Sequence, residues 1–211
     1  MGEGLARVLG GLAVGAGMLY FIYCTDVIFS FSFILALAVL MAYEWGSMVR
    51  NASEPRWWQW LGVLYLLGSL VPTLLLKFSG PRGNHLLMWV FILLWSVDTF
   101  AYVVGHVWNL SRHRISALSP SKSYEGLLGG IFFALIFCCI FAHLYLPEYE
   151  YRLLYCTPFL CCLEQAGDFT ESYFKRKFAL KDSGNMIPGH GGFMDRFDGL
   201  LYVVPALLFL I

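Results

Sequence analysis

The chain has 211 residues, of which 59% are hydrophobic and only 13% are charged, and its mean hydropathy is +0.67. Because a soluble domain carries about 25% charged residues, this composition excludes an ordinary soluble protein and indicates an integral membrane protein. The formal net charge of zero also excludes a simple basic nucleic-acid binder, so we expect no nucleic-acid partner.

Apolar runs of helical length recur along the chain. A helix needs about 20 apolar residues to cross a bilayer. The sequence predicts about seven such spans, at residues 6–24, 27–45, 57–76, 86–107, 126–146, 151–167 and 198–211. We therefore expect an all-α, polytopic membrane helical bundle with a polar cavity on its cytoplasmic side.

The positions of Lys and Arg indicate which way this bundle faces. Cytoplasmic loops of membrane proteins carry an excess of these two residues. With the N-terminus in the cytoplasm and seven alternating spans, only Lys77, Arg82 and Arg152 of the 14 Lys and Arg fall on the opposite side. The polar segments are thus predicted to face the cytoplasm, and a bacterial inner membrane is our default location.

Two of the acids in or beside the predicted spans bear on where a site could lie. Asp98 is about two turns from the cytoplasmic end of the fourth span. An ionisable group inside a span is costly and by default functional, with pairing to a nearby cation as the structural alternative. Glu44 ends the second span beside Trp45, where we interpret it as a solvated interfacial acid, with orientation toward a site as the alternative.

The segment after the fourth span has the composition of a phosphate-handling loop. Ser119, Ser121, Lys122 and Ser123 supply hydroxyls and one cation just before a helix start. Free N–H groups and the helix dipole favour an anion there. A serine followed by Glu125 in the first turn equally fits a simple helix cap, and both interpretations stay open.

The polar stretch 165–198 separates the last two predicted spans. Its charged residues are Asp168, Glu171, Lys175, Arg176, Lys177, Lys181, Asp182, Asp195, Arg196 and Asp198. Charge of this density must lie where water reaches it, either as a solvated loop or as a site at the membrane surface. The run PGHGG allows close backbone approach to a ligand, and carboxylates interleaved with cations suit a metal bound together with phosphate. Glu171 and Lys177 are also interpretable as a solvated helix face.

This stretch resembles the signature of the phosphatidate cytidylyltransferases, or CDP-diacylglycerol synthases. The matching positions are Ser172, Lys175, Arg176, Lys181, Asp182, Gly184, Pro188, His190, Gly191, Gly192, Asp195, Arg196 and Asp198. Upstream, GDFTES and Asp98-Thr99 with Ala101-Tyr102 are also similar to family motifs. In the serine loop, Ser121 replaces a lysine, so Lys122 and Glu125 are the better matches. The resemblance covers about residues 95–200, and the earlier residues match only in being hydrophobic.

The resemblance implies an enzyme that uses CTP and phosphatidic acid to make CDP-diacylglycerol and pyrophosphate, with Mg²⁺. Residues 1–94 would supply N-terminal transmembrane helices, and residues 95–211 a catalytic transmembrane region carrying the signature loop 165–198. The implied metal ligands are Asp98, Asp168 and Asp195. The implied catalytic residues are Asp98, Asp168, Lys181, Asp182, His190, Asp195 and Arg196. The implied substrate-binding residues are Lys122, Glu125, Ser172, Lys175, Arg176, Gly191, Gly192 and Asp198.

Two other functions share some of these features. A lipid or ion transporter also places acids in spans and breaks helices at glycine, but it predicts an internal repeat, which we do not find in the sequence. Another membrane nucleotidyl- or phosphotransferase would share the carboxylates but not the signature. The sequence leaves open the acyl-chain preference, CTP against dCTP, a second cation beside magnesium, and the oligomeric state, a homodimer included.

Overall fold

Helices make up nearly all of the described chain. The computed structural model describes residues 3–24, 26–52, 54–107, 115, 122–187 and 191–211. Its helices are α1 (Glu3–Tyr23), α2 (Val27–Asn51), α3 (Trp57–Lys77), α4 (Pro81–Val107), α5 (Tyr124–Tyr145), α6 (Glu150–Lys177), α7 (Met194–Phe197) and α8 (Leu200–Leu210). Within these ranges the only β pairing is one isolated bridge between Ile187 and Gly191. The predicted all-α fold is confirmed.

A helix occupies each of the seven predicted spans, but the helices differ in length and polarity. Among the described residues, α2, α3, α5 and residues 82–106 of α4 are long and apolar enough to cross a membrane. The apolar part of α1, Gly10–Tyr23, is shorter. Helix α8 has 11 residues, and at about 1.5 Å per residue it covers only part of a hydrocarbon core about 30 Å thick.

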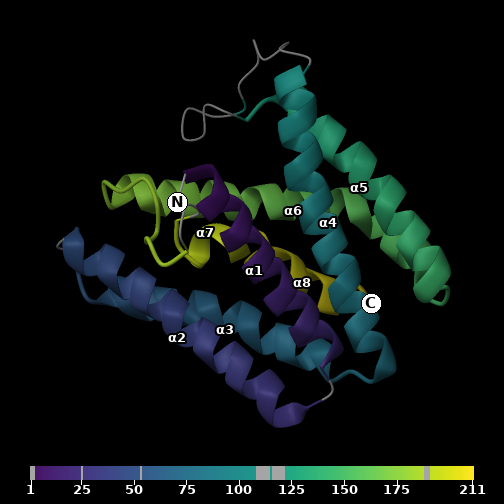
Figure 1. Ribbon diagram of the computed structural model, residues 1–211, viewed down its shortest axis with the longest axis horizontal. Coiled ribbons are helices and arrows are strands. Elements are labelled where there is room, and N and C mark those ends of the chain that lie inside the picture. Colours follow the sequence, from purple (N-terminus) through teal and green to yellow (C-terminus); the bar gives the residue numbers. More distant parts are fainter. Residues whose placement is uncertain (1–2, 25, 53, 108–114, 116–121, 188–190) are drawn as a thin grey trace.

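Helices α4 and α5 form an antiparallel pair that crosses α6 steeply (Figure 1). Glycines on α5 allow this pair to approach closely. A Cβ on Gly126 would lie 2.6 Å from the Ala101 carbonyl oxygen, and one on Gly130 would lie 2.8 Å from the Val97 carbonyl oxygen. Small residues at a seam of this kind let two helix backbones pack directly in lipid.

Helix α6 continues past its predicted end at residue 167. The first part of the stretch 165–198, predicted as a loop, is therefore helical as far as Lys177. The Glu171–Lys175 pair, one helical turn apart, stabilises this extension. Ala179 then adopts φ of 56°, and the Leu180 N–H bonds the Lys175 carbonyl at 2.7 Å. This left-handed residue ends the helix in the way that glycine usually does.

Tryptophan 45 fixes α2 against α3 and α6. Its Nε1 donates a hydrogen bond to the Trp58 carbonyl oxygen at 2.7 Å. The rings of Phe174 and Phe178 meet it edge-on, with centroids 5.1 and 5.9 Å away. Trp45 is buried and held by these contacts. The adjacent residue on α2, Glu44, therefore also has a fixed position relative to the end of α6.

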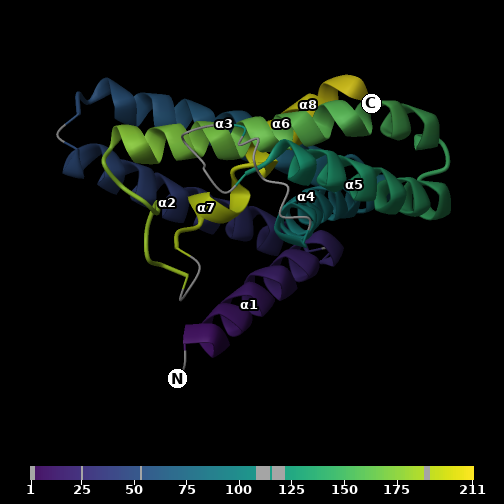
Figure 2. The same ribbon diagram turned by 90° about the horizontal axis from the view of Figure 1, so that it is seen from above.

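The chain after α6 turns back between the long helices. Figure 1 shows α7 and α8 in the middle of the molecule, with α2 and α3 on one side and the α4–α5 pair on the other. Seen from above, α1 diverges from the other helices toward the N-terminus (Figure 2). The polar residues of the chain between α6 and α8 therefore lie among the ends of several helices.

Candidate active site

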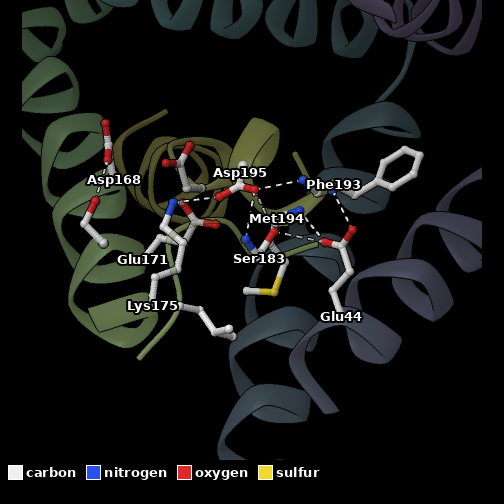
Figure 3. A network of polar contacts seen from close by, with 12 residues as sticks. Glu44, Asp168, Glu171, Lys175, Ser183, Phe193, Met194 and Asp195 are labelled. Atoms are coloured by element: carbon white, nitrogen blue, oxygen red, sulfur yellow. Dashed lines mark hydrogen bonds and ion pairs between the residues drawn. The ribbon is translucent and has the colours of Figure 1, made fainter. Parts of the chain in front are cut away.

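Asp195, on the short helix α7, is the most heavily bonded carboxylate near the signature loop. Its Oδ1 accepts from Lys175 Nζ at 2.6 Å. Its Oδ2 accepts from the Ser183 N–H at 3.0 Å, the Ser183 hydroxyl at 2.9 Å and the Gly192 N–H at 2.8 Å. Figure 3 shows these contacts converging on Asp195 from α6 and from the loop. Both oxygens of this predicted metal ligand thus have partners within the protein.

Lys175 lies between two carboxylates, because its Nζ is also 2.9 Å from Glu171 Oε2. Burial, together with the charges of Asp198 and Asp195, raises the pKa of Glu171 to about 9. Burial also opposes ionisation of Asp195, but Lys175 and the N–H donors outweigh it and lower the Asp195 pKa below its usual value. The interpretation of Glu171 as a solvated residue is wrong, since it is 1% exposed. The carboxylate is turned inward to meet Lys175.

Glu44 reaches the same loop from α2, on the other side of Ser183 (Figure 3). Its Oε1 accepts from the Phe193 N–H at 2.9 Å, and its Oε2 accepts from the Met194 N–H at 3.0 Å. The Ser183 hydroxyl lies 3.3 Å from Oε2. With 2% exposure, Glu44 is not the solvated interfacial acid that we expected. We call Glu44, Lys175, Ser183 and Asp195 the loop network.

Two glycines predicted to bind substrate make room for this network. Gly191 has φ of 80°, a conformation that favours glycine, and a Cβ there would lie 2.6 Å from Asp195 Oδ2. A Cβ on Gly192 would lie 2.1 Å from the Ser183 hydroxyl. The structure therefore gives Gly191 and Gly192 a role in packing the loop, beside the binding role that stays a prediction.

A second group of acids gathers where α4, α6 and the chain before α8 meet. Asp98 shares a side-chain hydrogen bond with Glu164 and interacts electrostatically with Lys122 and Asp168. Asp198 in turn interacts electrostatically with Asp168 and Asp98. We call Asp98, Glu164, Asp168 and Asp198 the acidic cluster. It joins two predicted metal ligands, Asp98 and Asp168, that lie 70 residues apart in the sequence.

Lys122 is a cation in direct contact with this cluster. Its Nζ forms an ion pair with Asp168 and donates to Gln165 Oε1 at 2.7 Å. The Ser172 hydroxyl donates to Asp168 Oδ1 at 3.2 Å. Lys122 and Ser172, both predicted to bind substrate, thus meet at one carboxylate. The Ser123 hydroxyl accepts from the Gly126 N–H at 3.1 Å, which confirms the helix-cap interpretation for Ser123.

Asp98 borders two cavities. One of about 210 Å³ is lined by Asp98, Asp195, Arg196 and Asp198, with the glycine-rich face of α1 on its other side. The second, of about 150 Å³, has a lining that includes Asp98, Lys122 and Gln165. Asp98 therefore lines both cavities, and the lining of each contains an acid and a cation. A polyanionic ligand with a divalent cation matches such a lining.

A third cavity of about 560 Å³ lies between the end of α2 and the loop after α6. Its lining includes Lys181 and Asp182, which are exposed, together with Ser47, Asn51 and Asn185. Arg176 is also exposed and donates to the Leu180 carbonyl oxygen at 3.1 Å. Lys181 and Asp182 thus lie on a different cavity from Asp98. His190, Ser119 and Ser121 lie outside the described residues.

The acidic cluster has the excess of negative charge that a bound divalent cation would neutralise. Among the described residues, four carboxyl groups there interact with two cations, Lys122 and Arg196. This excess of acid is what a bound Mg²⁺ neutralises. Nevertheless, among the described residues no three Asp, Glu, His or Cys side chains form a ready metal cage. Asp195 lines the 210 Å³ cavity, but its oxygens already accept hydrogen bonds from Lys175, Ser183 and Gly192.

Sequence reasoning missed Glu164 and Ser183 and preferred the wrong one of two interpretations for Glu44. Glu164 lies within the predicted sixth span, and an acid there is by default functional, so this signal was available. Glu44 carried the same signal, but its position at a span end favoured the solvated interpretation. Ser183 carried no signal, because one hydroxyl in a polar loop is ordinary.

A helical membrane bundle with acids and cations around its cavities suits a membrane protein that handles phosphate groups. The model of the cytidylyltransferase family matches residues 57–211. The phosphatidate cytidylyltransferase of Rickettsia bellii (strain RML369-C) is 34% identical over 220 residues, covering 97% of this chain and 89% of that relative. The chain therefore belongs to the cytidylyltransferase family.

Two further relatives match a shorter region. The phosphatidate cytidylyltransferases of Staphylococcus aureus (strain COL) and Bacillus subtilis (strain 168) are 40% and 44% identical over 133 residues. In both cases the match covers 61% of this chain and about half of the relative. The Rickettsia match extends the similarity well beyond the expected residues 95–200 and into the N-terminal helices.

Proposed function

We propose that this protein transfers CMP from CTP to phosphatidic acid and releases CDP-diacylglycerol and pyrophosphate. The observation that carries the proposal is that Asp98 and Asp198 of the acidic cluster line cavities together with Lys122 and Arg196 inside an apolar helical bundle. Such a setting brings a polyphosphate and a lipid headgroup to one place. The relatives named above as phosphatidate cytidylyltransferases support the same reaction.

The reaction needs positioning more than proton transfer. A phosphate oxygen of phosphatidic acid attacks the α-phosphorus of CTP, a new P–O–P bond forms, and the bond to the β-phosphate breaks as pyrophosphate leaves. The attacking oxygen is already anionic, so no strong general base is required. Lys122 and Arg196 are suited to hold the two anionic reactants together against their mutual repulsion.

Magnesium is part of the proposal. Asp98 and Asp168 would hold it, with Asp198 beside them, while Asp195 would act from the loop network. When bound, Mg²⁺ neutralises polyphosphate charge and stabilises the charge that develops on the leaving group. A second cation and a homodimer remain proposals of the same kind. We also propose a bacterial inner membrane as the location, with the acidic cluster facing the cytoplasm.

The direct test supplies purified protein in detergent or vesicles with CTP, phosphatidic acid and Mg²⁺. We expect pyrophosphate and CDP-diacylglycerol in equal amounts, with no product when phosphatidic acid is left out. ATP in place of CTP is the nucleotide control. No product with any nucleotide would remove the proposal, and lipid or ion flux without nucleotide would favour the transporter alternative.

A further inference from the structure

We infer that Glu44 of α2 is a positioning residue for the reaction. It holds the backbone of residues 192–194, so that Asp195 and Arg196 face the cavity they share with Asp98. The inference rests on the proposed function, because it assigns Glu44 to that same site. Glu44 lies outside residues 57–211, the part of the chain matched by the family model.

Three donors converge on this one side chain. The Phe193 and Met194 N–H groups bond the two separate carboxylate oxygens, and the Ser183 hydroxyl approaches one of them. Glu44 is 2% exposed, so water does not compete for these contacts. The N–H groups of residues 193 and 194 precede the helical bonds of α7 and need an external acceptor. A carboxylate from another helix satisfies both at once.

The loop packs closely against this carboxylate at two glycines. A Cβ on Gly184 would lie 2.8 Å from Glu44 Oε1, and one on Gly192 would lie 2.6 Å from Oε2. Glycine at both positions therefore lets two parts of the loop close around one side chain. Only a carboxylate accepts from all the donors there, because a Gln amide would turn its NH₂ toward one of the N–H groups.

The position of Glu44 affects Asp195 directly, because Ser183 contacts both acids. The Ser183 hydroxyl lies 3.3 Å from Glu44 Oε2 and 2.9 Å from Asp195 Oδ2, so both acids meet at one group. Asp195 and Arg196 immediately follow Met194, whose N–H Glu44 binds. Trp45 in turn holds α2 against α3 and α6. A shift of Glu44 therefore displaces residues that line the cavity, although Glu44 itself does not line it.

The test compares Glu44→Gln with the control Glu54→Gln. Glu54 lies at the same end of the molecule and pairs with Lys177 at 3.5 Å, outside the loop network. We expect Glu44→Gln to lower kcat at least about tenfold, with KM for both substrates changed less than about threefold. Its Tm should be lower than that of Glu54→Gln, because one buried N–H loses its acceptor, and amide hydrogen exchange should rise in residues 191–197. Wild-type kcat in a folded Glu44→Gln protein would overturn the inference, as would a fall in Tm with unchanged kcat per folded molecule.

The wild-type protein provides a second test that needs no variant. The amides of Phe193 and Met194 should exchange slowly, because a buried acceptor holds both of them. Fast exchange of these amides in the folded protein would overturn the inference even if Glu44→Gln fails to fold. Slow exchange in a protein that makes no CDP-diacylglycerol would retain the role of Glu44 in fixing the loop and reject only the proposed reaction.

Discussion

The loop network and the acidic cluster contain similar residues but differ in how their charges are matched. In the loop network, Asp195 and Glu44 together receive contacts from Lys175, the Ser183 hydroxyl and four backbone N–H groups. In the acidic cluster, carboxyl groups face one another, and Asp98 borders two cavities. Internal donors satisfy the first group, whereas the second is the group that we propose as the ligand site. Similar side chains thus hold a backbone in one place and are proposed to bind substrate in the other.

Asp98→Asn, in the acidic cluster, gives the largest expected effect on turnover. We expect turnover to fall about 1,000-fold, because the change removes a charge from the cluster where charge develops in the reaction. The Asn side chain can still hydrogen-bond Glu164, so the Tm should change little. CDP-diacylglycerol formation and thermal unfolding in detergent measure the two effects. Glu148→Gln, in an exposed ion pair with Arg82, is the control and should be silent in both. Full turnover in Asp98→Asn would end the functional assignment of the cluster.

Lys175→Met and Lys122→Met form a matched pair across the two regions. Lys175 is 14% exposed and holds Glu171 and Asp195, whose side chains are 2% and 6% exposed. Its loss leaves buried acids unpaired and should lower the free energy of unfolding by about 3 kcal/mol. Lys122 and Asp168 are more open, at 19% and 26%, so Lys122→Met should cost about 1 kcal/mol or less. Turnover per folded molecule should fall in Lys122→Met. The opposite stability order, measured by denaturant unfolding in detergent, would contradict the comparison.

Glu171→Gln tests the raised pKa of a carboxyl group that contacts Lys175 of the loop network. The folded-state pKa of Glu171 lies above its usual 4.5, at about 9. Between these values the folded protein keeps a proton that the unfolded chain has lost, so stability falls as pH rises through this window. One such group contributes at most about 1.4 kcal/mol per pH unit. Gln does not titrate, so the variant should lose this slope in unfolding measured at several pH values. An unchanged slope would show that Glu171 is ionised in the folded protein.

Ala179→Gly gives the smallest expected effect and tests how α6 passes into the loop. Ala179 is exposed and has φ of 56°, where a side chain is strained and glycine is not. Removing this strain, less the extra entropy of glycine in the unfolded chain, should stabilise the protein by about 0.5 kcal/mol. Turnover should not change, since neither the loop network nor the acidic cluster is touched. A loss of turnover would show that this turn does more than end α6.

The sequence predicts those parts of the molecule that depend on local chemistry. The long apolar runs specify helices because backbone polar groups in a membrane have to bond internally. An acid within such a run, such as Asp98, identifies a polar centre. The family signature identifies several charged residues around the cavities, namely Lys181, Asp182, Asp195, Arg196 and Asp198. These features need no knowledge of how distant helices pack.

The sequence alone does not reveal contacts that depend on tertiary packing. Glu44 and Phe193 are 149 residues apart, and nothing local shows that one accepts a hydrogen bond from the other. Likewise, Asp195 occupies a signature position, but only the fold shows its oxygens bonded to Lys175, Ser183 and Gly192. The end of α6 was misplaced because a charged segment suits a helix surface and a loop equally well.

Magnesium-dependent binding of CTP tests the central claim most directly. Thermal unfolding of the purified protein should shift to higher temperature with CTP and Mg²⁺ together, and much less with either alone. At 100 times the dissociation constant, the expected stabilisation is about 2.7 kcal/mol. Asp98→Asn should lose this shift while remaining folded. An undiminished shift in Asp98→Asn, or a wild-type shift that needs no Mg²⁺, would contradict the assignment of the acidic cluster as the site that binds the cation and polyphosphate.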